Sequence, residues 1–312
     1  MSLRKKTIKG KEYYYSELGY SILGKTKKFS KYIGLKKPTI KQLKEIDENF
    51  RKEVIERLSN KKYSCKYLSK DEVIKTLLYK DAFNKKFNSL SPTKKKKFEV
   101  DRTIIFTLTT LTTEDVDVSL NDVKEAYKHE TNLSLREQIS KNMLEAVESI
   151  KDGEEISVDY LLKLHSKIMS KFESKSPGKL REKQVYLHKR DEQNPLSIEI
   201  AYRPPSHAKL NSLLSDFTSW FRKSDLNPVE KAIIAHFKFY KIHPFLDGNK
   251  RICRLLFNRT LLEGGFPLIN ISENRDDYFD SLINSVEKNK PEILIKFALK
   301  EYYKQVKEFV KS

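Results

Sequence analysis

The chain has 312 residues, of which 38% are hydrophobic and 34% charged, and its formal net charge at pH 7 is +19. This length accommodates one large domain or two smaller ones. No apolar run reaches the length of a transmembrane helix, and residues 1–6 lack the apolar core of a signal peptide. The two cysteines, Cys65 and Cys253, predict no structural disulfide. We therefore expect a cytoplasmic protein that does not contact membranes.

Residues 1–38 form a predicted basic β appendage. Residues 1–40 carry eleven Lys or Arg and two acidic residues. Lys11–Tyr15 and Phe29–Ile33 have the pattern of extended strands, with a turn at Gly24–Lys25. Lysines beside Tyr13–Tyr15 are compatible with stacking on nucleic acid. The same tyrosines also fit half-buried strand positions of a hairpin packed on a helical body, and the two interpretations stay open.

Helices dominate from Thr39 onward. Residues 39–58 and 71–87 carry apolar stripes of helical period, and a break is expected at residues 91–93. The many threonines in residues 97–113 leave helix or strand undecided. Further helices are predicted over residues 119–129, 134–150, 157–170, 207–223 and 228–241. We expect a helical extension over residues 39–95, a helical region over 96–152 and a catalytic domain over 153–312.

One segment breaks the helical pattern. Residues 183–187 and 197–202 alternate like the strands of a β-hairpin, around a polar turn at residues 191–195. His236 lies on the apolar stripe of the 228–241 helix, which favours a buried core histidine over a catalytic one.

The segment His243–Arg254 combines the side chains of a nucleotide phosphate site. Histidine is the side chain best suited to accept a proton near neutral pH. An aspartate among basic groups can hold Mg²⁺, and a Gly-Asn turn that opens a helix offers backbone N–H groups to phosphate. Two arginines three residues apart share a helix face and can bind further phosphate oxygens.

This segment resembles the motif of the Fic family, His-x-Phe-x-Asp/Glu-Gly-Asn-Gly-Arg-x-x-Arg. The matching residues are His243, Phe245, Asp247, Gly248, Asn249, Arg251 and Arg254. Lys250 stands where most members have a second glycine. The similarity extends over about residues 96–290, which implies a mostly α fold: a helical Fic core with an inserted β-hairpin flap.

The resemblance implies protein AMPylation, the transfer of AMP from ATP to a Ser, Thr or Tyr hydroxyl of a target protein, with Mg²⁺. His243 would accept the hydroxyl proton and Asp247 would hold the metal. Gly248, Asn249 and the backbone N–H groups of the turn, including that of Lys250, would stabilise charge on the α-phosphate. Arg251 and Arg254 would hold the β- and γ-phosphates.

Three further features follow from the same resemblance. Val185, Tyr186 and Leu187 lie in the flap, which would bind the target peptide as an added strand. Tyr278 lies in the segment that would contact the adenine. Thr110–Glu114 resembles the family's inhibitory motif, in which Glu114 would pair with Arg254 and remove a γ-phosphate ligand. Asp115 replaces the usual Gly or Asn of that motif.

Lys250 leaves alternatives open. Doc-type relatives have lysine at this position, which implies transfer of a γ-phosphoryl group from an inverted nucleotide. Removal of AMP from a protein would use the same site, with Glu114 positioning water. A hypothesis of a different functional class is a basic nucleic-acid-binding protein with a degenerate Fic site, and the N-terminal segment motivates it. Self-modification, homodimer formation and a separate antitoxin are also left open.

Overall fold

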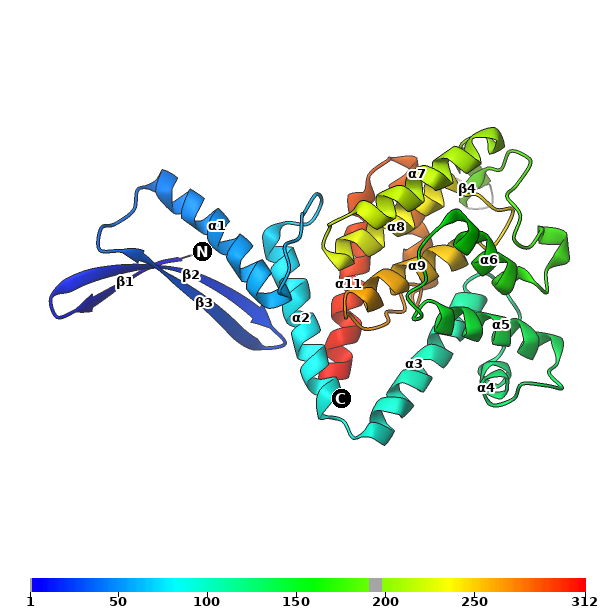
Figure 1. The fold of residues 1–312 in the computed structure, drawn as a ribbon, viewed down its shortest axis with the longest axis horizontal. Coiled ribbons are helices and arrows are strands. Elements are labelled where there is room, and N and C mark those ends of the chain that lie inside the picture. Colours follow the sequence, from blue (N-terminus) through cyan, green and yellow to red (C-terminus); the bar gives the residue numbers. More distant parts are fainter. Residues whose placement is uncertain (1, 191–197) are drawn as a thin grey trace. The chain divides into compact units, whose positions relative to one another are not determined.

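The computed structural model describes residues 2–190 and 198–312, and most of these residues lie in helices (Figure 1). The chain divides into two compact units. The first contains residues 1–86, 225–227 and 306–312, and the second contains residues 87–224 and 228–305. The predicted mostly α fold with small β elements is confirmed. Among the described helices, none has the length and apolar character needed to span a membrane. The division at residues 38, 95 and 152 stays a prediction.

The first unit begins with a three-stranded antiparallel sheet in chain order. Its strands are β1 (Ser2–Ile8), β2 (Lys11–Ile22) and β3 (Lys25–Gly34). Two-residue turns at Lys9–Gly10 and Leu23–Gly24 connect them, and both residues of each turn have positive φ, as tight hairpins require. The turn expected at Gly24–Lys25 therefore lies one residue earlier, because Lys25 already pairs with Ile22.

One face of this sheet is apolar and the other is not. Leu18 and Phe29 are directly opposed across β2 and β3, and both are buried. Helix α1 (Ile40–Ser59) buries Phe50 on this side, where Lys31 of β3 lies over the Phe50 ring. Strand residues alternate between faces, so Tyr13 and Tyr15 project from the opposite face.

The remaining helices confirm the predicted helical segments. They are α2 (Lys70–Ser89), α3 (Pro92–Thr112), α4 (Leu120–Lys128), α5 (Leu135–Ser149), α6 (Val158–Met169), α7 (Leu210–Lys223), α8 (Pro228–Ile242), α9 (Asn249–Glu263), α10 (Arg275–Glu287) and α11 (Pro291–Lys311). Helix α11 has no counterpart among the sequence predictions, and α10 corresponds to the segment of Tyr278 that the family resemblance indicated. The break predicted at residues 91–93 is present but lies at residues 90–91, between the end of α2 and the start of α3, which Ser91 caps at the backbone N–H of Lys94.

The ambiguous segment at residues 97–113 is helical. Two of its threonines donate their hydroxyls to carbonyls four residues earlier, from Thr109 to Ile105 and from Thr112 to Leu108. The hydroxyls of Thr107 and Thr110 are buried and have no hydrogen-bond partner among the described residues. Helix α3 runs to Thr112, immediately before Glu114.

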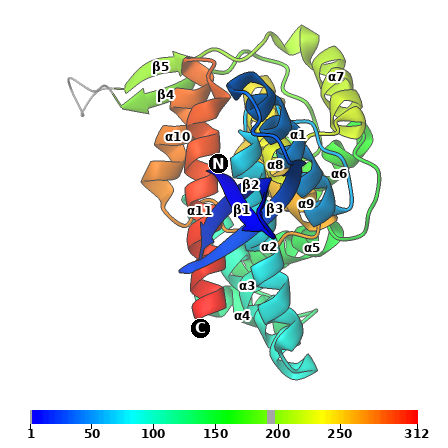
Figure 2. The same cartoon turned by 90° about the vertical axis from the view of Figure 1, so that its left-hand side faces the viewer.

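In the second unit, α8 and α9 pack against each other and almost every residue of α9 is buried. A hairpin of β4 (Leu187–Arg190) and β5 (Ile198–Tyr202) lies beside α10 (Figure 2), where Lys189 pairs with Glu287. The expected first strand at residues 183–187 is wrong except for its last residue. Gln184 instead bonds the carbonyls of Val185 and Pro204, which holds this segment without a strand ladder. The expected turn at residues 191–195 lies outside the described residues.

Candidate active site

The loop from His243 to Gly248 connects α8 to α9 and carries the first half of the motif. His243 has a left-handed backbone, with φ of 48°, and its N–H donates to the carbonyl of Phe239. Arg181 holds the loop from the other side: its Nε donates to the His243 carbonyl at 2.8 Å, and its backbone N–H donates to the Pro244 carbonyl. The position of His243 therefore depends on an arginine distant in sequence.

The middle of the loop is fixed by Asn249. Its side-chain Oδ1 accepts from the Phe245 N–H at 3.1 Å, and its Nδ2 donates to the Phe245 carbonyl at 2.9 Å. Both polar ends of the side chain are thus occupied by backbone. Any contribution of Asn249 to a phosphate site would come from its backbone N–H. Phe245 itself is fully buried and anchors the loop in the core.

His165 of α6 supports the same loop. Its ring stacks on Phe245 with centroids 3.7 Å apart. Its Nδ1 accepts from the Gly178 N–H, so its Nε2 carries the proton and donates to the Asp247 carbonyl at 3.0 Å. Burial lowers the pKa of His165 to about 4, which keeps the imidazole neutral in this role.

Gly248 must be glycine at this turn. Its φ is 76°, in the left-handed region, and an added Cβ would lie 2.9 Å from Sδ of Met169. The space above Gly248 is therefore already filled by Met169 and His165. Close packing holds the start of α9 in one position.

His243 is placed to accept a proton. Burial, and then the positive charge of Lys250, lower its pKa well below the ordinary histidine value. The imidazole is consequently neutral at pH 7, which is the form that a general base requires. Its Nδ1 is buried and has no hydrogen-bond partner among the described residues.

The first turn of α9 provides backbone donors, and Asp247, just before the N-cap Gly248, provides one carboxylate. The first N–H groups of a helix have no partner within it, which makes this end a site for anions. Asp247 accepts from the Gly248 N–H through Oδ1 and leaves Oδ2 for other contacts. The described residues contain no group of three or more potential metal ligands. A single carboxylate fits Mg²⁺, which takes one or two carboxylates together with phosphate oxygens.

Arg251 is a buried cation without a carboxylate partner. Only 2% of the residue is exposed, and its NH1 contacts Sδ of Met169 at 3.0 Å. Its Nε has no hydrogen-bond partner among the described residues, and none of their ion pairs includes Arg251. The charges of Glu114 and Asp247 favour the guanidinium without forming an ion pair with it, and burial is unfavourable for a charge without a direct partner. This guanidinium is therefore suited to a further anionic ligand.

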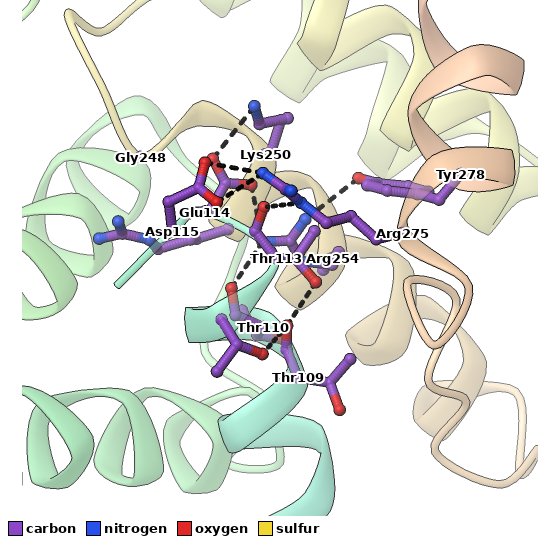
Figure 3. A network of polar contacts seen from close by, with 12 residues as sticks. Thr109, Thr110, Thr113, Glu114, Asp115, Gly248, Lys250, Arg254, Arg275 and Tyr278 are labelled. Atoms are coloured by element: carbon purple, nitrogen blue, oxygen red, sulfur yellow. Dashed lines mark hydrogen bonds and ion pairs between the residues drawn. The ribbon is translucent and has the colours of Figure 1, made fainter. Parts of the chain in front are cut away.

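Arg254 is fully buried and is held from several sides (Figure 3). Its NH2 donates to the Thr110 carbonyl and to Oε1 of Glu114, each at 3.0 Å. Its NH1 lies 3.4 Å from the Tyr278 hydroxyl, which also lies 3.0 Å from Nε2 of His236. Tyr278 is thus buried behind Arg254 and supports it. His236 is a buried histidine with a hydrogen-bond partner, as the sequence predicts.

Glu114 joins α3 to the motif. Its side chain is 7% exposed, and its second oxygen lies 3.1 Å from Nζ of Lys250. Burial raises the pKa of Glu114, but the charges of Arg254, Lys250 and Arg251 outweigh burial and hold the pKa below its ordinary value. The carboxylate is therefore ionised. The contact with Arg254 that the sequence predicts is present.

The predicted flap residues are spread over the approach to β4. Val185 and Tyr186 precede the strand, and Leu187 is its first residue and is buried. Tyr186 is 41% exposed, and an arginine lies over its ring. Two residues of β5 not singled out in the sequence, Ile198 and Ile200, are 72% and 58% exposed. The hairpin thus presents apolar side chains to solvent.

Sequence reasoning did not find Arg181, His165 or Met169 as parts of this site. None of them lies in the His243–Arg254 segment, and each acts through a neighbour: Arg181 on the His243 backbone, His165 on the Asp247 backbone, and Met169 on Arg251 and Gly248.

Comparisons with known proteins agree with this geometry. Residues 155–261 match the model of the Fic/DOC family. A 136-residue segment, 42% of this chain, is 32% identical to protein adenylyltransferase fic-1 of Caenorhabditis briggsae, and 137 residues are 31% identical to protein adenylyltransferase Fic of Nematostella vectensis. These matches cover only 24% and 29% of those relatives, so the chain spans about a quarter of their length.

Solved structures show the same fold. Fic-1 of C. elegans has a TM-score of 0.62 at 18% identity, covering 87% of this chain and 75% of that one. A Fic family protein of Desulfovibrio desulfuricans has a TM-score of 0.63 at 19% identity, covering 80% and 77%. With the loop, the helix start and the two arginines in place, residues 155–261 of this chain are a Fic/DOC family domain.

Proposed function

We propose that this chain is a protein adenylyltransferase: it transfers AMP from ATP to a hydroxyl side chain of a protein. Relatives that carry the name protein adenylyltransferase support the activity over the matched segment. The observation that carries the proposal in this structure is Arg251, a buried guanidinium beside the helix start that forms no ion pair with the described residues. A polyphosphate supplies the missing negative charge.

The reaction follows from the placement of the groups. The target hydroxyl loses its proton to the His243 imidazole as its oxygen bonds to the α-phosphorus of ATP. The bond between that phosphorus and the oxygen bridging to the β-phosphate breaks, and pyrophosphate leaves. Backbone N–H groups at the start of α9 stabilise the charge on the α-phosphate, and Arg251 holds the departing phosphates.

The metal that this chemistry implies is Mg²⁺. Asp247 would hold it through the carboxylate oxygen that does not accept from Gly248. When bound, the cation neutralises phosphate charge and favours departure of pyrophosphate. The protein's own part is to keep Asp247 in place through His165, which donates to its carbonyl.

Glu114 restrains this activity in our proposal. Its contact with Arg254 occupies the guanidinium that would bind the γ-phosphate. ATP that enters while this contact persists cannot use Arg254, so its α-phosphate is not aligned for attack by the hydroxyl. Release of Glu114 would free Arg254 and permit transfer.

The contacts of Lys250 favour AMP transfer over Doc-like phosphoryl transfer. Its ammonium pairs with Glu114 and lies 4.5 Å from the centroid of the Phe279 ring. The Lys250 ammonium thus lies at the Arg254 end of the site. The α-phosphate would then be bound by the backbone N–H groups at the start of α9. ATP labelled at the α or at the γ position distinguishes the two reactions: we expect only the α label on protein. Removal of AMP by the same site is tested by release of label from pre-labelled protein.

The exposed hairpin would bind the target. Ile198, Ile200 and Tyr186 offer apolar contacts, and the edge of a two-stranded sheet offers unpaired backbone groups to an extended peptide. Replacing Ile200 with Ser should raise the KM for a protein target and leave ATP affinity unchanged. Unchanged KM would remove the hairpin from target binding.

A second candidate function is binding of single-stranded nucleic acid by the N-terminal sheet. On the face opposite α1, Tyr32 is 50% exposed and its ring centroid lies 5.4 Å from that of Tyr15 and 6.1 Å from that of Tyr13. Lys6 lies over Tyr15, which adds positive charge to an aromatic surface. Fluorescence anisotropy with labelled oligo-dT tests it: Tyr32→Ala should weaken binding, and His243→Ala should not.

A further inference from the structure

Two departures from the family motifs lie next to each other in this structure. Lys250 stands where most members have glycine, and Asp115 stands where the inhibitory motif has Gly or Asn. The first lies in α9 and the second just beyond α3, 135 positions earlier in the sequence numbering. Figure 3 shows both residues close to Glu114, in a cluster that also contains Arg254 and Arg275.

Lys250 adds a second cation to Glu114. Its Nζ lies 3.1 Å from Oε2, while Arg254 holds Oε1 at 3.0 Å. The carboxylate is therefore held at both oxygens, each by a different cation. A glycine at position 250 would leave Oε2 without this partner. Because Glu114 is almost fully buried, the pair is poorly screened by solvent.

Asp115 is part of the turn that ends α3. The N–H of Val116 donates to the Leu111 carbonyl and that of Asp115 donates to the Thr112 carbonyl, which are the two bonds of a Schellman motif. Its left-handed residue is Asp115, with φ of 57°. This conformation explains why Gly or Asn is usual at the position.

Aspartate offsets this backbone strain with a contact that glycine could not make. Both oxygens of Asp115 lie 2.7 Å from NH2 of Arg275, the first residue of α10. The Arg275 Nε donates to the Thr113 carbonyl at 3.1 Å. Phe279, one turn further along α10, lies under both Arg275 and Lys250. Helix α10 therefore holds the residues on either side of Glu114.

We propose that Lys250, Asp115 and Arg275 form a latch that keeps Glu114 on Arg254. These are positioning residues: they act on Glu114, and the latch sets how often Arg254 becomes available to ATP. The inference rests on the proposed AMP transfer and its restraint by Glu114, and it adds the residues by which this chain strengthens that restraint.

The activity test compares each variant in two backgrounds. With Glu114 present, Lys250→Met should raise transfer of α label about tenfold, because it removes a partner of a buried carboxylate. Asp115→Asn and Arg275→Gln remove a more exposed pair and should each raise transfer about two- to fivefold. Asparagine tolerates the left-handed conformation, so the turn is kept. The Asp115→Asn/Arg275→Gln double variant should not exceed the larger single effect.

In the Glu114→Gly background the same substitutions should produce no increase, because the group they hold is absent. Increases of equal size in both backgrounds would overturn the latch. Lys296→Met, an exposed lysine on α11, is the matched charge control and should leave transfer unchanged in both backgrounds. High salt should raise transfer by the unmodified chain toward the Asp115→Asn level, because the Asp115–Arg275 pair is accessible to ions.

A second measurement does not depend on transfer. Amide hydrogen exchange of residues 113–118, without nucleotide, should be faster in Lys250→Met and Arg275→Gln than in the unmodified chain or Lys296→Met. Unchanged exchange in both variants would overturn the inference whatever the activity. Absence of α-label transfer in Glu114→Gly, with faster exchange in the latch variants, would instead reject AMP transfer and retain the latch.

Discussion

Replacement of Glu114 by glycine perturbs the site most directly. It removes a carboxylate that contacts Arg254 at 3.0 Å and Lys250 at 3.1 Å in an almost fully buried position. A hydrogen bond to a charged group contributes about 1.5–3 kcal/mol net, and 1.4 kcal/mol corresponds to a tenfold change in an equilibrium. We therefore expect transfer of AMP to rise about 10- to 100-fold. Glu114→Gln, which keeps the size of the side chain, should act in the same direction.

The same substitution should alter stability in a way that ATP reverses. Without Glu114, Arg254 is a buried cation that has lost its carboxylate, and loss of one partner of a buried pair typically costs about 3–5 kcal/mol. We expect a lower Tm than in the unmodified chain without nucleotide. Since the triphosphate can replace the carboxylate at Arg254, ATP should raise the Tm of the variant more than that of the unmodified chain.

Two assays check this reasoning: the initial rate of α-label incorporation, and thermal unfolding with and without ATP and Mg²⁺. Glu148→Gly, at an exposed position of α5, is a matched control for loss of a glutamate. Transfer within twofold of the unmodified chain, together with an unaltered Tm shift by ATP, would refute the restraint.

Other predictions concern the loop and the buried histidines. His243→Ala should lower transfer about 10²–10⁴-fold with little change in ATP affinity by calorimetry, and undiminished transfer would exclude it as the base. Gly248→Ala should destabilise the fold by about 1–3 kcal/mol in urea unfolding, because its Cβ would lie 2.9 Å from Met169 Sδ and φ is 76°; an unchanged midpoint would contradict this packing. Burial lowers the pKa of His165 to about 4 and that of His236 to about 3, below the ordinary value of about 6.5. These groups bind protons more readily when unfolded, so the free energy of unfolding should fall from about pH 6.5 to pH 4, by up to ~1.4 kcal/mol per pH unit for each histidine. His236→Gln should reduce that slope, and an identical slope would argue against a neutral His236.

The helices could be predicted largely because their apolar residues recur at helical spacing. The structure adds caps at their starts: Thr39 and Ser157 each accept from a backbone N–H three residues later. Residues 97–113 could not be decided, because threonine propensity favours neither state strongly. The hydroxyls of Thr109 and Thr112 bond carbonyls of the same helix, which only the folded backbone reveals.

The motif itself was recognisable because its residues are consecutive and each has a distinct chemistry. Its supports were not, because they come from other elements. Arg181 lies 62 positions before the carbonyl that it holds, and His165 lies 82 positions before the Asp247 carbonyl. Neither separation leaves a periodic signal. The side chain of Asn249 is likewise occupied by Phe245, a contact that a phosphate-binding interpretation of the motif does not suggest.

The same limit applied to Glu114. The spacing of Thr110 and Glu114 suggested a contact with Arg254, but nothing in the pattern placed Lys250 on the second oxygen. Asp115 was recognised as a departure without a reason for it. The pair with Arg275 supplies that reason, and it depends on α10 being folded against the end of α3.

The most direct test of AMP transfer is incubation of the Glu114→Gly variant with Mg²⁺ and ATP labelled separately at the α and the γ position, followed by measurement of protein-bound label. We predict that α label becomes bound, that γ label does not, and that His243→Ala abolishes incorporation. Exclusive incorporation of γ label would contradict AMP transfer and establish phosphoryl transfer from an inverted nucleotide.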